Sequence, residues 1–317
     1  MSKTYIFLSV FCGVVILFFI WLYNPPAKPT SATLPDENVN AATTSSETAL
    51  DDKVIHVTEE NVAREKRSFV TDFDEAYTVE ESANPLESTS DIWWLSSGAY
   101  FISEKGTAGT VQGELSSNDM WRNRYLQSNA LDTDKGYHPQ NIFRLIQKNV
   151  WENYSQHLYF RIMDDHLSAS PNRNASNGVL LFNRYQDQFN LYYVGIRVDG
   201  HVTVKKKYDG TYYSLAYKPF TTESAYDRDT EPNLLPKNTW IGLRSDVYTN
   251  IDDEVVITLY MDLDNSDNWE LLTEAVDVDG LYGNTPTLKK GRAGIRTDFM
   301  DVEFDRYGIY EHDNISR

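Results

Sequence analysis

The feature that most constrains the fold is a long series of short segments in which apolar and polar residues alternate, starting at Phe69. Glycine, asparagine and aspartate separate the segments. Alternation with a period of two is typical of strands with one buried face, and turn residues between them favour antiparallel pairing. The clearest segments are GVLLFNRY (178–185), NLYYVGIRV (190–198), HVTVKKKY (201–208), EVVITLYMD (254–262) and GRAGIRTD (291–298). The sequence therefore predicts an all-β domain over residues 69–317, built as a two-sheet antiparallel jelly-roll sandwich.

Residues 190–217 form two linked hairpins whose register the pattern selects. A three-residue loop at 198–200 sorts the flanking apolar side chains onto one face, whereas a two-residue loop mixes the two faces. Because a slip of one residue turns every side chain over, we expect the longer loop. A two-residue loop, Asp209-Gly210, then leads into the next strand. The expected pairs are Ile196–Val202, Val194–Val204, Gly195–Thr203, Tyr193–Lys205, Val204–Leu215, Val202–Tyr217 and Lys207–Tyr212.

This register predicts a core face and a polar face. Lys206 falls on the core face near the strand end, where its aliphatic stem can carry the charge to water. The polar face is a candidate ligand-binding surface, because tyrosine rings pack on sugar rings and cations pair with acidic groups. Its residues are Tyr193, Arg197, His201, Lys205, Lys207 and Tyr212. The core face carries Val194, Ile196, Val202, Val204, Leu215 and Tyr217.

Several segments resemble the concanavalin A-like lectin/glucanase domains. The opening strands of that family are similar to DIWWLSSGAYFIS (91–103), GTVQGEL (109–115) and NIFRLIQKNVWENYSQHLYFRI (141–162). Its later strands are similar to TWIGLRSDV (239–247), residues 255–277 and GRAGIRTDFMDVEFDRYGIY (291–310). The nearest subgroups are laminin-G-like and 3-keto-disaccharide-hydrolase-like domains. The resemblance implies a jelly roll whose concave sheet or an edge loop binds glycans. We expect Trp93, Trp94, Trp151 and Trp240 in its core.

Catalytic members of this fold would show a further motif. Glycoside hydrolases that resemble it carry Glu-x-Asp-x-(x)-Glu on one strand, which places paired carboxylates on one face. No segment here matches, since Ser316 stands where the motif begun by Glu311 needs its last acid. The acids of 301–305 are in the wrong order and are expected to be structural or solvated. Lyase chemistry needs no such motif, and Tyr193, His201 and His138 are its candidate bases, so the catalytic residues stay unknown.

The segment DLDNSDN (262–268) gathers hard oxygen ligands of the kind that calcium prefers. Its candidate ligands are Asp262, Asp264 and Asp267, which would hold a structural calcium ion. The spacing does not follow the calcium-loop pattern, because Thr273 stands at position 12 and no glycine stands at position 6. A hairpin loop of turn-forming residues is the alternative interpretation.

The first residues predict a membrane anchor. Tyr5–Tyr23 carries no charged residue, and a helix of that length spans about 28 Å, close to the hydrocarbon thickness of a bilayer. Residues 1–4 would form a short cytoplasmic end, and residues 24–68 an acidic flexible linker or stalk. The domain then lies outside the cytoplasm in a single-pass membrane protein. The alternative is a cleaved signal peptide and a secreted domain.

The formal net charge of −18 makes nucleic acid an unsuitable partner. Three functions stay open. The first is a membrane-anchored, extracytoplasmic carbohydrate-binding domain for a polysaccharide or other glycan, with an acidic polysaccharide favoured by the cationic face. The second is a polysaccharide-degrading enzyme, either a lyase or a glycoside hydrolase. The third is an adhesive or structural domain that binds another protein.

Overall fold

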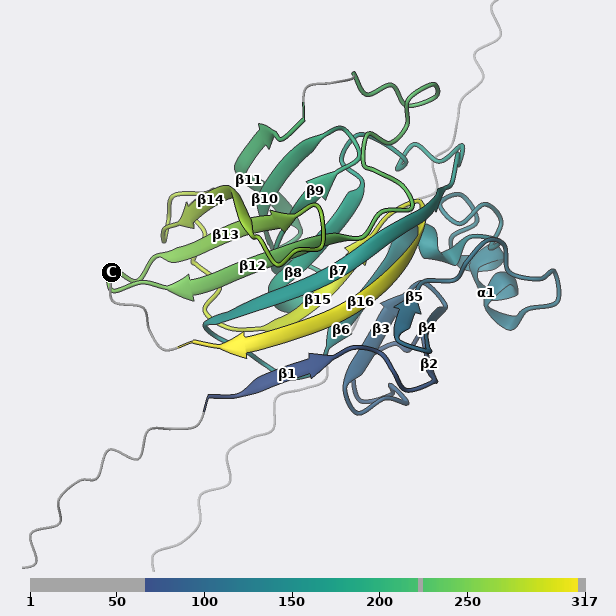
Figure 1. Ribbon diagram of the computed structural model, residues 1–317, viewed down its shortest axis with the longest axis horizontal. Helices are drawn as coiled ribbons and strands as arrows, with labels where there is room; N and C mark the ends of the chain where they lie inside the picture. Colours follow the sequence, from purple (N-terminus) through teal and green to yellow (C-terminus); the bar gives the residue numbers. More distant parts are fainter. Residues whose placement is uncertain (1–65, 222–224, 313–317) are drawn as a thin grey trace, which may run out of the picture. The chain divides into compact units, whose positions relative to one another are not determined.

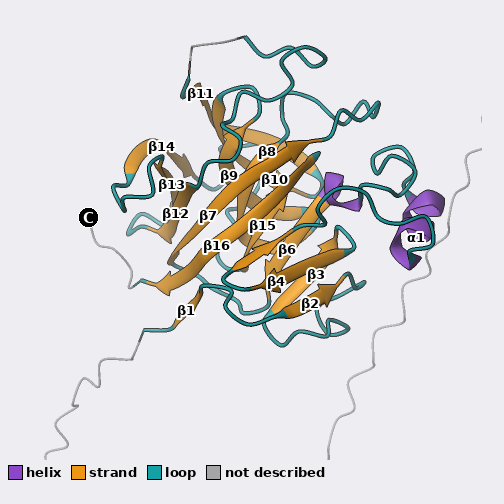
Figure 2. Ribbon diagram, turned by 45° about the vertical axis from the view of Figure 1, so that its right-hand side comes forward, coloured by secondary structure: helices purple, strands orange, loops and turns teal. Residues whose placement is uncertain are grey.

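The computed structural model describes residues 66–221 and 225–312. The expected cytoplasmic end and membrane span, and nearly all of the expected linker, lie outside these residues. Within the described ranges no helix is long and apolar enough to cross a membrane. These residues form two antiparallel sheets with one short α-helix at their side (Figure 1, Figure 2). The predicted all-β, two-sheet antiparallel sandwich is therefore confirmed.

The larger sheet of the described residues has nine strands, in the order β14-β13-β12-β7-β16-β5-β4-β2, with β1 also paired to β16. The long strands β7 and β16 run side by side through its middle (Figure 1). The bounds are β1 Ser68–Thr71, β2 Tyr77–Glu80, β4 Tyr100–Glu104, β5 Thr107–Gly109, β7 Tyr154–Asp165, β12 Ile241–Thr249, β13 Val255–Asp262, β14 Glu270–Asp277 and β16 Met300–Glu311.

The smaller sheet has seven strands in the described residues, in the order β11-β10-β9-β8-β15-β6-β3. Its bounds are β3 Trp93–Ser97, β6 Phe143–Gln147, β8 Gly178–Asp187, β9 Asn190–Arg197, β10 His201–Tyr208, β11 Thr211–Pro219 and β15 Arg292–Thr297. The helix α1 spans Met120–Ser128, and a 3-10 turn, η1, spans Pro139–Ile142. Because the chain crosses between the sheets many times, strands from both ends of the domain are neighbours in each sheet, as in a jelly roll.

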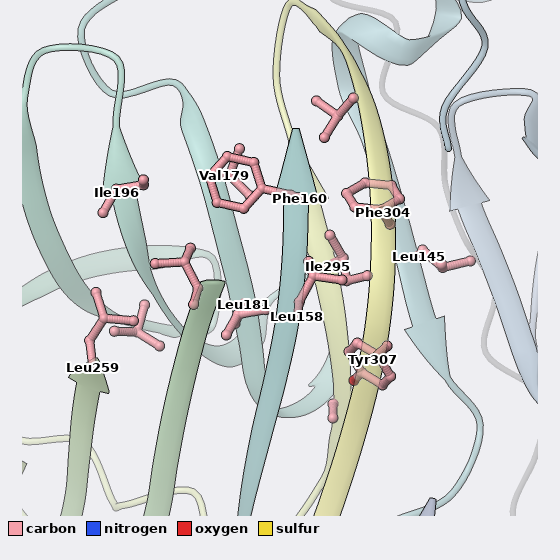
Figure 3. Close-up of a cluster of buried hydrophobic side chains, with 14 of the residues drawn as sticks. Leu145, Leu158, Phe160, Val179, Leu181, Ile196, Leu259, Ile295, Phe304 and Tyr307 are labelled. Atoms are coloured by element: carbon pink, nitrogen blue, oxygen red, sulfur yellow. The ribbon is translucent and has the colours of Figure 1, made fainter. Parts of the chain in front are cut away.

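The core lies between the two sheets and is built from the alternating inward side chains of both. Phe160 and Leu158 of β7 point inward from the larger sheet, and Leu181 of β8 and Ile295 of β15 meet them from the smaller one (Figure 3). All four are fully buried. The opposite faces of both sheets are therefore left for solvent or ligands.

The first hairpin has the predicted register. Val202 pairs with Ile196, and Lys205 pairs with Tyr193. Gly195 lies opposite Thr203 as expected.

The second hairpin corrects part of the prediction. Lys207 pairs with Tyr212, but a β-bulge between Val204 and Lys205 then shifts the register. Val204 therefore pairs with Ala216 and Val202 with Lys218, so the predicted pairs Val204–Leu215 and Val202–Tyr217 are wrong. The extra residue turns Tyr217 out of the core, and it is 49% exposed beside His201.

The environment of Lys206 is also different from the prediction. Its side chain does not reach water but is fully buried, with Nζ 2.8 Å from the buried Asp277 carboxylate of β14. The Tyr192 hydroxyl donates to the same carboxylate oxygen. The inward position was correct, and the strand end proved to be covered by the edge of the larger sheet. An ion pair thus joins the two sheets where snorkelling was expected.

Candidate functional site

The outer face of the smaller sheet carries an open groove of about 1010 Å³. All seven strands of the described sheet supply lining residues, and the loop before β3 and the turn after β8 form its rim. The lining residues used below, called the groove residues, are Trp94, Arg144, Phe182, Tyr185, Asp187, Tyr193, Lys207, Tyr212, Arg292 and Arg296.

The floor of the groove is apolar and aromatic. Phe182, Tyr185 and Tyr193 belong to a buried cluster on this face, and Trp94 packs against it. The Trp94 and Tyr185 rings meet edge to face with their centroids 6.1 Å apart, and Tyr193 meets Tyr212 in the same way at 6.1 Å. Such rings offer flat apolar surface together with hydroxyl groups that bond to ligand.

Cationic side chains stand over this floor. Arg144 lies 2.8 Å from the buried Asp298 carboxylate, and Arg296 lies 2.9 Å from its other oxygen. The Arg296 guanidinium is 5.4 Å from the centre of the Tyr193 ring, and the Lys207 ammonium is 4.8 Å from the centre of the Tyr212 ring. These contacts fix the cations over the faces of the aromatic rings.

The groove is positively charged although the chain is strongly acidic. Its lining holds Arg144, Arg292, Arg296 and Lys207, whereas Asp187 is the only carboxylate among the described lining residues. The buried Asp298 carboxylate, which contacts both Arg144 and Arg296, offsets one more of these positive charges. Burial lowers the pKa of Arg296, but the Asp298 carboxylate outweighs burial and raises it on balance. The guanidinium is therefore charged at any physiological pH.

The groove tyrosines act as neutral hydrogen-bonding groups. Burial raises the pKa of Tyr193 to about 12 and that of Tyr185 to about 12. Both phenols therefore stay protonated near pH 7. This state suits a hydroxyl that donates to a ligand oxygen and does not suit a general base.

The structure divides the six predicted ligand-binding residues into two groups. Tyr193, Lys207 and Tyr212 line the groove. Lys205 lies on the same face and is partly buried, and its pKa is lowered by burial and by the nearby Arg197 and Arg296.

Arg197 and His201 lie beyond the groove lining, in a cluster around Asp199. The Asp199 carboxylate is 2.8 Å from the Arg197 guanidinium and 3.3 Å from His201 Nδ1. The His201 and Tyr217 rings stack with their centroids 4.4 Å apart, and the Tyr217 hydroxyl donates to Asp199. The third lyase candidate, His138, stacks on His166 and lies 3.1 Å from Asp134, also outside the groove.

The candidate calcium ligands accept hydrogen bonds from their own loop and from Tyr159 of β7. Asp262 is buried, and its carboxylate accepts from the Tyr159 hydroxyl and from the backbone N–H groups of Asp264, Ser266 and Asp267. No group of three or more histidine, cysteine, aspartate or glutamate side chains in the described chain is arranged to hold a metal ion. The hydrogen bonds fit the hairpin-loop interpretation, and calcium binding stays a prediction.

The predicted structural role of the acids at 301–305 can be checked at two positions. Asp301 is buried and accepts from the Gly113 backbone and from Gln140. Glu303 pairs with Arg161 across the sheet. Asp301 thus has a structural role, whereas Glu303 forms a partly exposed ion pair.

Seven of the ten groove residues were not assigned to the site from the sequence: Trp94, Arg144, Phe182, Tyr185, Asp187, Arg292 and Arg296. Trp94 was expected in the core with Trp93, but the two residues alternate, so Trp93 is buried and Trp94 points outward. Trp240, also expected in the core, is only half-buried against Arg161. The alternation of the sequence could have indicated the outward facing of Arg144, which stands between the buried apolar residues Phe143 and Leu145. It was weaker for Arg296, which stands between the buried Ile295 and Thr297.

Comparison with protein-family models gave no match, and comparison with curated proteins gave none either. Among solved structures, the chain is similar to the carbohydrate binding module CBM66 from Bacillus subtilis, with 12% identity, a TM-score of 0.36, and coverage of 52% of this chain and 80% of that one. It is also similar to a β-1,3-1,4-glucanase (lichenase) derived from a mouse hindgut metagenome, with 9% identity, a TM-score of 0.40, and coverage of 78% and 99%. A protein of unknown function with a galectin-like fold from Bacillus subtilis has 12% identity, a TM-score of 0.39, and coverage of 75% and 100%. These likenesses leave open what this chain binds.

Proposed function

We propose that this protein binds an acidic polysaccharide in the groove on the outer face of the smaller sheet. The observation that carries the proposal is the composition of the groove: an aromatic floor beneath four cations, with one carboxylate in the lining. Aromatic surface suits the apolar face of a pyranose ring, and guanidinium groups suit carboxylate or sulfate groups, which they bind bidentately.

The size and shape of the groove favour a polymer over a small ligand. Its volume of about 1010 Å³ lies at the upper end of the range for small-molecule sites. It is open and extends from Trp94 on β3 to Tyr212 on β11, across the order of strands in the sheet. A chain of several sugar units can lie along it, with each acidic group near a different cation.

Binding fits the groove better than cleavage does. Hydrolysis of a glycosidic bond uses two carboxylates on either side of the bond, and the described lining holds only Asp187. The tyrosine expected as a lyase base, Tyr193, has a raised pKa, and His201 and His138 are engaged outside the groove. No observation favours an adhesive role towards another protein over glycan binding.

The proposal includes the location. Residues 5–23 would hold the domain at a membrane and residues 24–68 would tether it outside the cytoplasm, where polysaccharides are found. Secretion after cleavage of residues 5–23 is the alternative. We also propose that the domain is a laminin-G-like or 3-keto-disaccharide-hydrolase-like member of the concanavalin A-like group.

A glycan array, with and without calcium, followed by titration calorimetry tests the function. We expect binding of at least one uronate-containing or sulfated polysaccharide, and comparison of the two calcium conditions tests the predicted calcium ion. Exchange of Lys207 for alanine should weaken binding about tenfold, equivalent to ~1.4 kcal/mol. Binding should also weaken as salt is raised, because screening reduces the attraction between exposed charges.

Arg197→Ala is the matched control. It removes a cation from the same face of the sheet, but the charge of this cation is already neutralised by Asp199. We expect its affinity to stay within about twofold of the parent, ~0.4 kcal/mol. Equal affinities of the parent and the Lys207→Ala variant, or binding of neutral glycans only, would reject the groove as an acidic-glycan site. Absorbance from unsaturated uronate products in the same mixtures would instead reveal a lyase.

A further inference from the structure

The outer face of the larger sheet carries a second, smaller pocket of about 450 Å³ on the opposite side of the sandwich. Strand register builds it in rows across β12, β7 and β16. Arg244, His157 and Gly308 form one row. The neighbouring rows are Asp246, Ser155 and Tyr310, and Gly242, Tyr159 and Asp305. Trp269, just before β14, closes one side.

Two glycines make room for the rings of this pocket. A Cβ atom on Gly308 would lie 2.4 Å from the His157 ring, and one on Gly242 would lie 2.8 Å from the Trp269 ring. Any side chain at either position would push a ring away from the sheet. The His157 and Tyr310 rings stack with centroids 5.8 Å apart, and Tyr310 is 41% exposed. The result is an aromatic platform open to solvent, in which the Trp269 ring is tilted by 53° from the His157 ring.

A bulge in β16 supplies a further wall. The register of β16 against β7 shifts between Asp305 and Gly308, and Arg306 within the bulge has a φ of 44°. This left-handed conformation is unfavourable for a side-chain residue and bulges often re-aim side chains at binding sites. The Arg306 guanidinium consequently lies 3.7 Å from the centre of the Tyr159 ring.

Each arginine of this pocket has a carboxylate beside it, whereas cations outnumber carboxylates in the lining of the groove. Arg244 forms two hydrogen bonds of 3.0 Å with the Asp246 carboxylate, and Arg306 lies 3.4 Å from Asp305. Asp267 adds a third carboxylate at the rim. Burial, with the nearby Arg244 and Arg306, lowers the pKa of His157, so its ring is neutral near pH 7.

From this geometry we propose that the platform of His157, Trp269 and Tyr310 is a second glycan-binding site, and that it takes an uncharged sugar. Paired carboxylate and guanidinium groups around an aromatic surface offer donors and acceptors to adjacent sugar hydroxyls. The protein would then hold an acidic polymer on one face and a neutral glycan on the other. The second site does not depend on the ligand of the groove.

The test titrates the full-length protein with neutral hexasaccharides of β-1,4-glucose, β-1,3-glucose and β-1,4-mannose, and with hexagalacturonate as the acidic probe. We expect at least one neutral probe to bind, and Trp269→Ala to weaken it about tenfold or more. Gly308→Ala should weaken it likewise by displacing His157. Trp240→Ala is the matched control, because it also removes a partly exposed tryptophan.

This design can refute the proposal for one site without refuting the proposal for the other. Neutral binding that is unaffected by Lys207→Ala and by salt, but lost in Trp269→Ala, supports the second site whatever hexagalacturonate does. No binding of any neutral probe at millimolar concentration overturns it, and so does equal weakening by Trp269→Ala and Trp240→Ala. Loss of neutral binding in Lys207→Ala would place that sugar in the groove and also overturn the second site.

Discussion

Removal of either partner alone from the buried ion pair between Lys206 and Asp277 should strongly destabilise the fold. At 2.8 Å and an effective dielectric constant of about 20, the attraction is roughly 6 kcal/mol before desolvation is subtracted. Burying each ion costs several kcal/mol, so the pair as a whole contributes little net stability. Loss of one partner leaves the other charge buried without compensation.

We therefore expect Lys206→Met to destabilise the protein by about 3–5 kcal/mol. For a domain of this size, such a change lowers the melting temperature by roughly 6 to 20 °C. The double variant Lys206→Met/Asp277→Asn keeps an acceptor for the Tyr192 hydroxyl and removes both charges. It should be more stable than the sum of the single effects by about 2 kcal/mol or more.

Guanidinium-induced unfolding of the four proteins of this cycle gives the coupling energy. The exposed pair Lys289–Asp253 is the control, because its lysine and aspartate side chains are 40% and 73% exposed. Lys289→Met should change stability by less than about 1 kcal/mol. A cost for Lys206→Met as small as that of the exposed control, or additive single effects, would refute the reasoning.

Two further predictions concern acid stability and strand packing. Burial raises the pKa of Asp301, but hydrogen bonds from His166, Gln140 and a backbone N–H outweigh it and lower the pKa below the ordinary 3.8. Asp301 thus stabilises the fold above that pH, and this contribution is lost as the pH falls through its folded-state pKa. The urea midpoint of the Asp301→Asn variant should therefore fall less than that of the parent between pH 5 and about pH 2. An equal fall in the two proteins would contradict this. Gly195→Ala should destabilise by about 2 kcal/mol or more, because its Cβ would lie 2.3 Å from the Val179 carbonyl oxygen, and an unchanged melting temperature would contradict it.

Local alternation predicted the fold class and the facing of the first hairpin, because burial of one sheet face imposes a period of two. It did not predict the bulge at Val204, since the extra residue, Leu215, is itself apolar and fits either register. The position of Tyr217 depended on that single residue. Errors in register of this kind arise where a strand at the sheet edge has only one neighbour to fix it.

The full site could not be predicted because it is assembled by strand order. Arg144 and Arg296 alternate correctly within their own segments, yet only the neighbouring positions of β6, β15 and β8 bring them to Tyr193. The partner of Lys206 lies on a strand of the other sheet, and no residue near Lys206 in the sequence indicates this pairing. Residue facing was thus a local property, whereas the grouping of residues was not.

The most direct test of the central claim is a crystal structure of the protein with an acidic hexasaccharide that it binds. The account predicts sugar rings packed over Trp94 and Tyr193, with their carboxylate or sulfate groups against Arg296 and Lys207. A sugar chain bound elsewhere, with these four side chains left in contact only with solvent, would contradict it.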